Sequence, residues 1–168
     1  YAYLGLAPAA GWDRLEALVI EITYGHFDVG VRDLLTCQHL ARVTELHLCN
    51  ARPRDQTRQA LATALPLGRL RKLGLAYGEV TPAIAAGIVQ SPALLALTEL
   101  DLSRNDLGDE GAAALAECPQ LSRLTVLNLS GVRLTDRGLR RLIASPYLTG
   151  LRELDLSNNP QLSAAGVR

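Results

Sequence analysis

Residues 97–115 read LTELDLSRNDLGDEGAAAL, and this stretch joins two different periodicities. Leu100 and Leu102 alternate with acidic and polar residues, so their side chains point to one face of an extended strand. Asp109 precedes an alanine-rich run, where its carboxylate can accept hydrogen bonds from the free N–H groups at a helix N-terminus. The run itself, Ala112–Leu115, consists of strong helix formers. The stretch therefore predicts a strand, a turn and a helix.

The same pattern recurs along the chain, each copy with apolar residues at its first, fourth and sixth positions. The first members are Leu15, Val43, Leu70, Leu97, Leu124 and Leu151, spaced by 28 residues once and then by 27. The second half repeats as well, with Asp-x-Gly beginning at residues 28, 109 and 136, and Ser-Pro or Cys-Pro at 91, 118 and 145. A strand and helix of this size cannot bury an apolar face alone, whereas stacked copies share one continuous core. The spacing therefore predicts a solenoid.

This periodicity divides the chain into one array over residues 1–168. We expect the end of a preceding repeat at 1–14, full repeats at 15–42, 43–69, 70–96, 97–123 and 124–150, and a partial repeat at 151–168. Strands are predicted at Leu18, Leu46, Leu73, Leu100, Leu127 and Leu154, and helices near 29–37, 55–64, 82–90, 109–117 and 136–144. Stable arrays need polar capping units, and neither end of this sequence shows one. The chain is therefore expected to be a segment of a longer protein.

These units resemble the leucine-rich repeat family, specifically its ribonuclease-inhibitor-like branch. The junction Ser145-Pro146-Tyr147-Leu148 is also similar to bacterial arrays that are often found beside a short repeat-companion domain. The resemblance implies an α/β horseshoe with a parallel β-sheet on the concave face, helices on the convex face, and binding of other proteins. One departure concerns the ninth position, where the family usually places Asn. That column here reads Thr23, Ala51, Gly78, Asn105, Val132 and Asn159.

Composition excludes several other classes of protein. The 17 basic and 17 acidic side chains give a net charge of zero, which argues against a nucleic-acid interface carried by overall charge. A hydrophobic content of 48% argues against disorder. No apolar run approaches the roughly 18 residues of a membrane span. No signal peptide is visible, so a cytoplasmic location is expected.

Nothing in the sequence indicates a catalytic, cofactor-binding or metal-binding residue. Cys37, Cys49 and Cys118 occupy columns that otherwise hold Ala or Ser, which predicts small buried thiols and no disulfide. The histidines, His26, His39 and His47, form neither an HExxH motif nor a zinc-like spacing with cysteine. Phosphate-loop, dinucleotide and nucleophile-elbow motifs are also missing. We therefore expect no enzyme activity, no cofactor and no small-molecule substrate.

The concave face is the surface that the sequence marks for function. The positions on either side of the fourth-position leucine project away from the core. The third-position column reads Ala17, Glu45, Lys72, Glu99, Val126 and Glu153, and the fifth-position column reads Val19, His47, Gly74, Asp101, Asn128 and Asp155. This acidic surface fits a basic protein partner, although charges also keep an exposed sheet soluble. The predicted partner-binding residues are Glu45, His47, Lys72, Glu99, Asp101, Asn128, Glu153 and Asp155.

The sequence thus predicts a non-enzymatic protein-binding scaffold that binds neither nucleic acid nor membrane. Three alternatives stay open from the family resemblance. The array could regulate an enzyme whose catalytic domain lies elsewhere, act in the manner of a GTPase activator, or recognise substrates for a ubiquitin ligase beside an F-box. A catalytic or F-box domain in the full-length protein would distinguish them.

Overall fold

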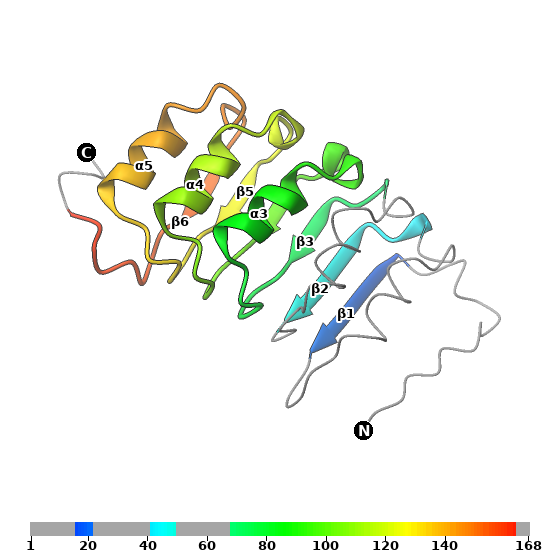
Figure 1. Ribbon diagram of the computed structural model, residues 1–168. Helices are drawn as coiled ribbons and strands as arrows, with labels where there is room; N and C mark the ends of the chain where they lie inside the picture. The colour runs from blue at the N-terminus through cyan, green and yellow to red at the C-terminus, as the bar shows by residue number, and fades with distance from the viewer. Residues whose placement is uncertain (1–15, 22–40, 50–67, 164–168) are drawn as a thin grey trace.

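A computed structural model describes residues 16–21, 41–49 and 68–163, and within them the strands form a single parallel sheet. The strands follow chain order and are β1 (Ala17–Glu21), β2 (Glu45–Cys49), β3 (Lys72–Gly74), β4 (Glu99–Asp101), β5 (Val126–Asn128) and β6 (Glu153–Asp155). The helices are α3 (Pro82–Val89), α4 (Gly108–Ala116) and α5 (Asp136–Ile143), with short 3-10 turns η4 (Pro92–Ala96) and η5 (Pro119–Leu121). Figure 1 shows the helices stacked on one side of the sheet. The predicted α/β solenoid is confirmed.

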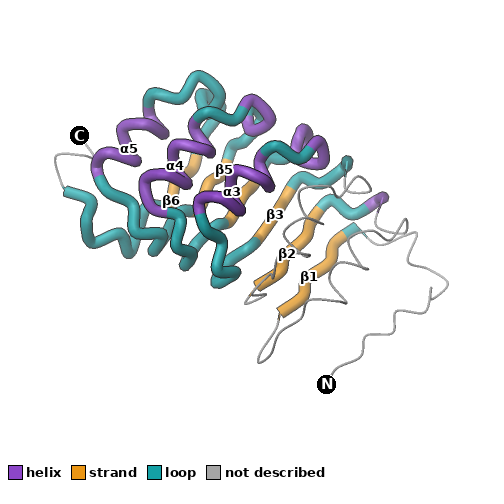
Figure 2. The backbone as a smooth tube through the Cα atoms, viewed as in Figure 1, coloured by secondary structure: helices purple, strands orange, loops and turns teal. Residues whose placement is uncertain are grey.

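The repeat register is also confirmed, because equivalent leucines pair across every joint between strands. Leu18 pairs with Leu46, Leu46 with Leu73, Leu73 with Leu100, Leu100 with Leu127, and Leu127 with Leu154. The three predicted helices at 82–90, 109–117 and 136–144 appear within one residue of their expected bounds. Those predicted at 29–37 and 55–64 lie outside the described residues. Figure 2 shows strands, helices and loops alternating regularly along the tube.

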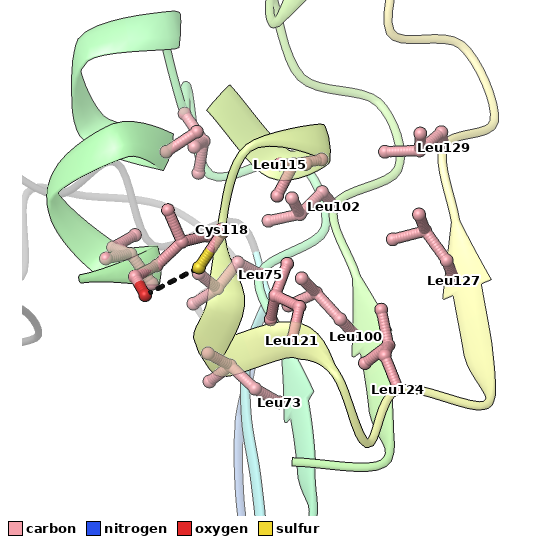
Figure 3. Packing of buried hydrophobic residues seen from close by; sticks show 14 of the residues in the cluster. Leu73, Leu75, Leu100, Leu102, Leu115, Cys118, Leu121, Leu124, Leu127 and Leu129 are labelled. Atoms are coloured by element: carbon pink, nitrogen blue, oxygen red, sulfur yellow. Dashed lines mark hydrogen bonds between the residues drawn. The ribbon is translucent and has the colours of Figure 1, made fainter. Parts of the chain in front are cut away.

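The core lies between the sheet and the helices and is built mainly from leucine. Leu97, Leu115, Leu121, Leu124 and Leu127 have no exposed surface. Figure 3 shows side chains from β4, α4 and η5 meeting in this layer. Full burial of a leucine stabilises a fold by about 2 kcal/mol. Because neighbouring repeats bury these leucines together, the stability of the stack comes from contacts between repeats as well as within them.

Two asparagines join consecutive repeats through backbone groups. Asn105 Oδ1 accepts hydrogen bonds from the N–H groups of Gly78 and Val80, and its Nδ2 donates to the carbonyl of Leu75, each at 2.9 Å. The same amide nitrogen donates to the carbonyl of Leu102 in its own repeat, at 2.8 Å. Asn159 makes the equivalent set of bonds to the repeat before it. These two members of the ninth-position column therefore connect the third repeat to the fourth and the fifth to the sixth.

The prediction that Asp109 caps its own helix is wrong. Its carboxylate accepts hydrogen bonds from the backbone N–H and the hydroxyl of Thr135, at 2.9 and 2.7 Å, one repeat further along the chain. Thr135 is the N-cap of α5, and its hydroxyl oxygen accepts from the N–H of Arg137 at 3.2 Å. Asp136 holds Ser163 in the same way, at 2.8 and 2.6 Å. The aspartate in this slot therefore binds a Thr or Ser of the next repeat, which at Thr135 is the N-cap of α5.

The cysteine prediction is confirmed for Cys118 and only partly for Cys49. Cys118 is buried and its Sγ lies 3.0 Å from the carbonyl of Val89, the last residue of α3. Ser145, in the same column, donates to the carbonyl of Ala116 at the end of α4. Cys49 is half-buried, and neither it nor Cys118 forms a disulfide. Cys37 lies outside the described residues.

Candidate docking surface

The face of the sheet opposite the helices, here called the open face, carries all the predicted partner-binding residues. Strand pairing places the third-position residues Glu45, Lys72, Glu99, Val126 and Glu153 in one row across the sheet. A second row holds His47, Gly74, Asp101, Asn128 and Asp155. In β2, β4 and β5 these residues are half-buried and alternate with buried leucines, so they point away from the core.

Two of the carboxylates on the open face, Glu99 and Glu45, have a side-chain partner there. Lys72 Nζ lies 3.0 Å from Glu99 Oε1, and His47 Nε2 lies 2.9 Å from Glu45 Oε1. The hydrogen bond to Glu99 and the charge of that carboxylate raise the pKa of Lys72. The imidazole ring of His47 covers Gly74, where a Cβ atom would overlap its Nδ1 atom. Lys72 thus balances the charge of Glu99, and His47 is a hydrogen-bond partner of Glu45.

The fifth-position residues of β4, β5 and β6 have a structural role that sequence analysis missed. Oδ1 of Asp101, Asn128 and Asp155 accepts a hydrogen bond from the N–H of Ser103, Ser130 and Ser157, at 2.8, 3.0 and 2.8 Å. Each bond closes the turn that ends the strand, and the backbone N–H of Ser157 is the main cause of the lowered pKa of Asp155. The signal was the recurrent spacing of Asp or Asn two residues before Ser.

The turn bond means that Asp101 is more than a surface charge. Lysine offers no acceptor to the N–H of Ser103, so Asp101→Lys would open the turn as well as reverse the charge. Asparagine keeps the acceptor, as Asn128 shows in the same row.

The remaining acidity is concentrated towards β6. Glu153 and Asp155 are exposed, and Asp101 lies two strands away in the same row as Asp155. No group of three or more His, Cys, Asp and Glu side chains in the described part of the chain could hold a metal ion. Across the same residues, no helix is long and apolar enough to cross a membrane. The arrangement is thus a charged surface with turn-bound carboxylates.

Comparison with known proteins places this geometry in a family. The model of the family described as "Leucine Rich repeat" matches residues 96–116 and 147–168. A crystal structure of a protein from Bacteroides fragilis is similar with a TM-score of 0.67 and 23% sequence identity, covering 88% of this chain and 42% of that one. The chain therefore spans less than half of that neighbour, and the likeness concerns the fold. No curated protein matches the chain.

The repeat spacing, the parallel sheet and the two matched segments together define an α/β solenoid that contains leucine-rich repeats. Such repeats generally act in protein–protein interaction, and they are typically non-enzymatic scaffolds. The match describes leucine-rich repeats in general, so the ribonuclease-inhibitor-like branch stays a prediction.

Proposed function

We propose that this array is a binding scaffold whose open face docks a basic protein partner. The observation that supports it is the uneven charge on that face. Glu99 and Glu45 have cationic or imidazole partners, whereas no ion pair within the described part of the chain involves Asp101, Glu153 or Asp155. A partner bearing Lys or Arg side chains would supply the missing opposite charge over β4 to β6.

Electrostatic complementarity of this kind acts mainly on the rate of encounter and on specificity. Exposed charges steer a partner over roughly 8–10 Å at physiological ionic strength, and added salt screens them. Binding through these carboxylates should therefore weaken steadily as salt is raised. If these carboxylates serve only solubility, partner binding should depend neither on them nor on the salt that screens them.

The test uses Asp101→Asn together with Asp155→Asn, which removes two charges and keeps both turn acceptors. A fluorescein-labelled peptide of alternating Lys and Ser serves as the probe, and its anisotropy is followed over a range of NaCl concentrations. We expect weaker binding and a shallower salt dependence for the double variant than for the wild type.

The matched control is Glu110→Gln together with Glu117→Gln, which removes the same charge from exposed positions on the helix side. This control should bind the peptide as the wild type does. Equal binding by the wild type and both double variants would show that the open face is not the docking surface. Equal losses in both would show that only net charge matters.

The open alternatives concern what the array serves, and they stay proposals of the same kind. A regulatory or substrate-recognition module would use the same face, because an array supplies a surface rather than a reaction.

A further inference from the structure

The loops that follow β3, β4, β5 and β6 form a rim along the carboxyl ends of the strands. One column of this rim is Tyr77, Arg104, Gly131 and Asn158, each 27 residues from the next. Backbone hydrogen bonds join its rungs: Tyr77 N–H to the carbonyl of Ser103, Arg104 N–H to Ser130, and Gly131 N–H to Ser157, at 3.1, 2.8 and 2.9 Å. Tyr77 and Arg104 therefore lie on adjacent rungs of the stack.

The backbone of this column is left-handed, a conformation that costs Tyr77 and Arg104 conformational free energy. The φ angles are 55° for Tyr77, 58° for Arg104, 65° for Gly131 and 56° for Asn158. Glycine and asparagine take this conformation readily, whereas tyrosine and arginine do not. Tyr77 is 54% exposed and Arg104 is also exposed, so neither is compensated by burial in the core. Glycine or asparagine, as at 131 and 158, suits this backbone conformation better than tyrosine or arginine does. What Tyr77 and Arg104 contribute is therefore the exposed side chain that each presents.

The side chain of Arg104 is held in place and its charge is uncommitted. Its stem lies over Gly131, where a Cβ atom would approach Arg104 Cδ to 3.0 Å and Nε to 3.4 Å. On the same rim, Arg133 Nη1 contacts both carboxylate oxygens of Asp106, at 3.0 and 3.1 Å. Among the described residues, no carboxylate makes such a pair with Arg104. A guanidinium placed in this way presents a planar donor fork that suits a carboxylate.

We propose that Tyr77 and Arg104 form a docking spot for an acidic segment of a protein partner. Arg104 binds a carboxylate of that segment, and Tyr77 packs against the side chain beside it. Tyrosine and arginine are the residue types that most often carry binding energy at protein interfaces. The spot lies beyond the strand ends. It binds negative charge, whereas the open face is proposed to bind positive charge. It therefore stands independently of the function proposed above.

The experiment uses a fluorescein-labelled peptide of alternating Glu and Phe, with a peptide of alternating Gln and Phe for comparison. The wild-type protein should bind the Glu peptide more tightly than the Gln peptide. Arg104→Asn should weaken binding of the Glu peptide about tenfold, as expected for the loss of a charge-assisted pair. Tyr77→Asn should weaken binding of both peptides. Neither variant should lower the melting temperature, because asparagine suits a positive φ.

Two further variants separate placement from charge. Arg123→Asn removes the same charge from an exposed position before β5 and should leave binding unchanged. Gly131→Asn keeps every charge but displaces the stem of Arg104, so it should weaken binding of the Glu peptide.

The proposal is overturned if the wild type binds both peptides equally or neither, or if Arg123→Asn weakens binding as much as Arg104→Asn. The Lys peptide provides the independent comparison, since its binding should be unaffected by Tyr77→Asn. If the open-face double variant binds the Lys peptide as the wild type does, while the Glu peptide still binds through Arg104, the proposed function fails and the rim proposal stands.

Discussion

At the scale of single residues, a small number of polar side chains fixes the turn geometry between repeats, which leucine burial does not. Leucine burial holds the repeats together but is indifferent to small slips along the stack. Asn105 is only 5% exposed, and its side chain forms hydrogen bonds with backbone groups of two repeats. Such a side chain fixes the turn geometry because unpaired buried amides are costly.

Asn105→Ala should therefore lower the free energy of unfolding by about 3 kcal/mol, since it leaves several buried backbone groups without partners. Urea denaturation measures the change. Val132→Ala is the control in the same column, because that side chain is equally buried and apolar. Its removal should cost only about 1.5 kcal/mol, the transfer free energy of two methyl groups. Equal losses in the two variants would mean that the amide bonds add nothing beyond packing.

The carboxylate of Asp109 makes stability depend on pH. Partial burial alone would raise its pKa, but hydrogen bonds from Thr135 and Gly138 and the charge of Arg137 outweigh this, and the pKa lies below the ordinary value of 3.8. The folded state thus holds this proton less tightly than the unfolded chain does. The stabilisation is fully present above about pH 4 and is lost as the pH falls through the lowered pKa.

Asp109→Asn should consequently be less stable than the wild type at neutral pH, and the difference should shrink as the pH falls below 3.8. Chemical denaturation at several pH values from neutral to strongly acidic gives the two curves. A gap that stays constant over the whole range would show that ionisation of Asp109 contributes nothing. Glu110→Gln, one residue away and exposed, is the matched control and should follow the wild-type curve.

At the scale of the elements, side chains from adjacent repeats bind helix ends. Asp109 holds the N-cap of α5, and Ser145 binds the last carbonyl of α4. Gly138 allows the approach at the first of these contacts, because a Cβ atom there would collide with Asp109 Oδ1. Short helices of this length are marginal alone, so such contacts between repeats decide where they begin and end.

The bond from Cys118 to Val89 can be tested by two substitutions. Cys118→Ser keeps a donor in a column that also holds Ser91 and Ser145, and it should change stability little. Cys118→Ala leaves the last carbonyl of α3 without this donor and should cost about 1 kcal/mol more. Thermal unfolding of the two variants side by side measures the difference. If alanine is as stable as serine, the thiol acts only as a small apolar group.

These contacts also show what the sequence could and could not predict. The L-x-x-L-x-L period and the constant spacing leave a single in-register stack, so Leu46, Leu73 and Leu100 were placed correctly. The role of Asp109 could not be predicted, because its partner Thr135 lies 26 residues away. Rules for helix capping consider only the adjacent turn of the same helix.

The candidate surface was predictable in the same partial way. Alternation along a strand assigns Glu99 and Asp101 to the open face, and strand pairing bears this out. It cannot show that Lys72 pairs with Glu99, since that depends on side-chain conformations across two strands. Nor does alternation show that the carboxylate of Asp101 also closes a turn.

At the scale of the whole molecule, stability is a sum over neighbouring repeats, and it need not be uniform along the stack. In the described part of the chain, each strand pairs only with the strands of adjacent repeats. Loss of a contact at one joint should therefore loosen the two repeats that meet there more than the repeats further along the stack.

Asn105 and Asn159 make equivalent bonds at different places in the stack, so they test this directly. Asn159→Ala should speed amide hydrogen exchange in β6 and in the turn around Val132, and leave α3 and β3 protected as in the wild type. Asn105→Ala acts at an interior joint, so exchange should rise on both sides of it, in β3 and β4 alike. Exchange monitored by mass spectrometry resolves these segments. Uniform acceleration along the array by Asn159→Ala would mean that the described repeats unfold as one cooperative unit.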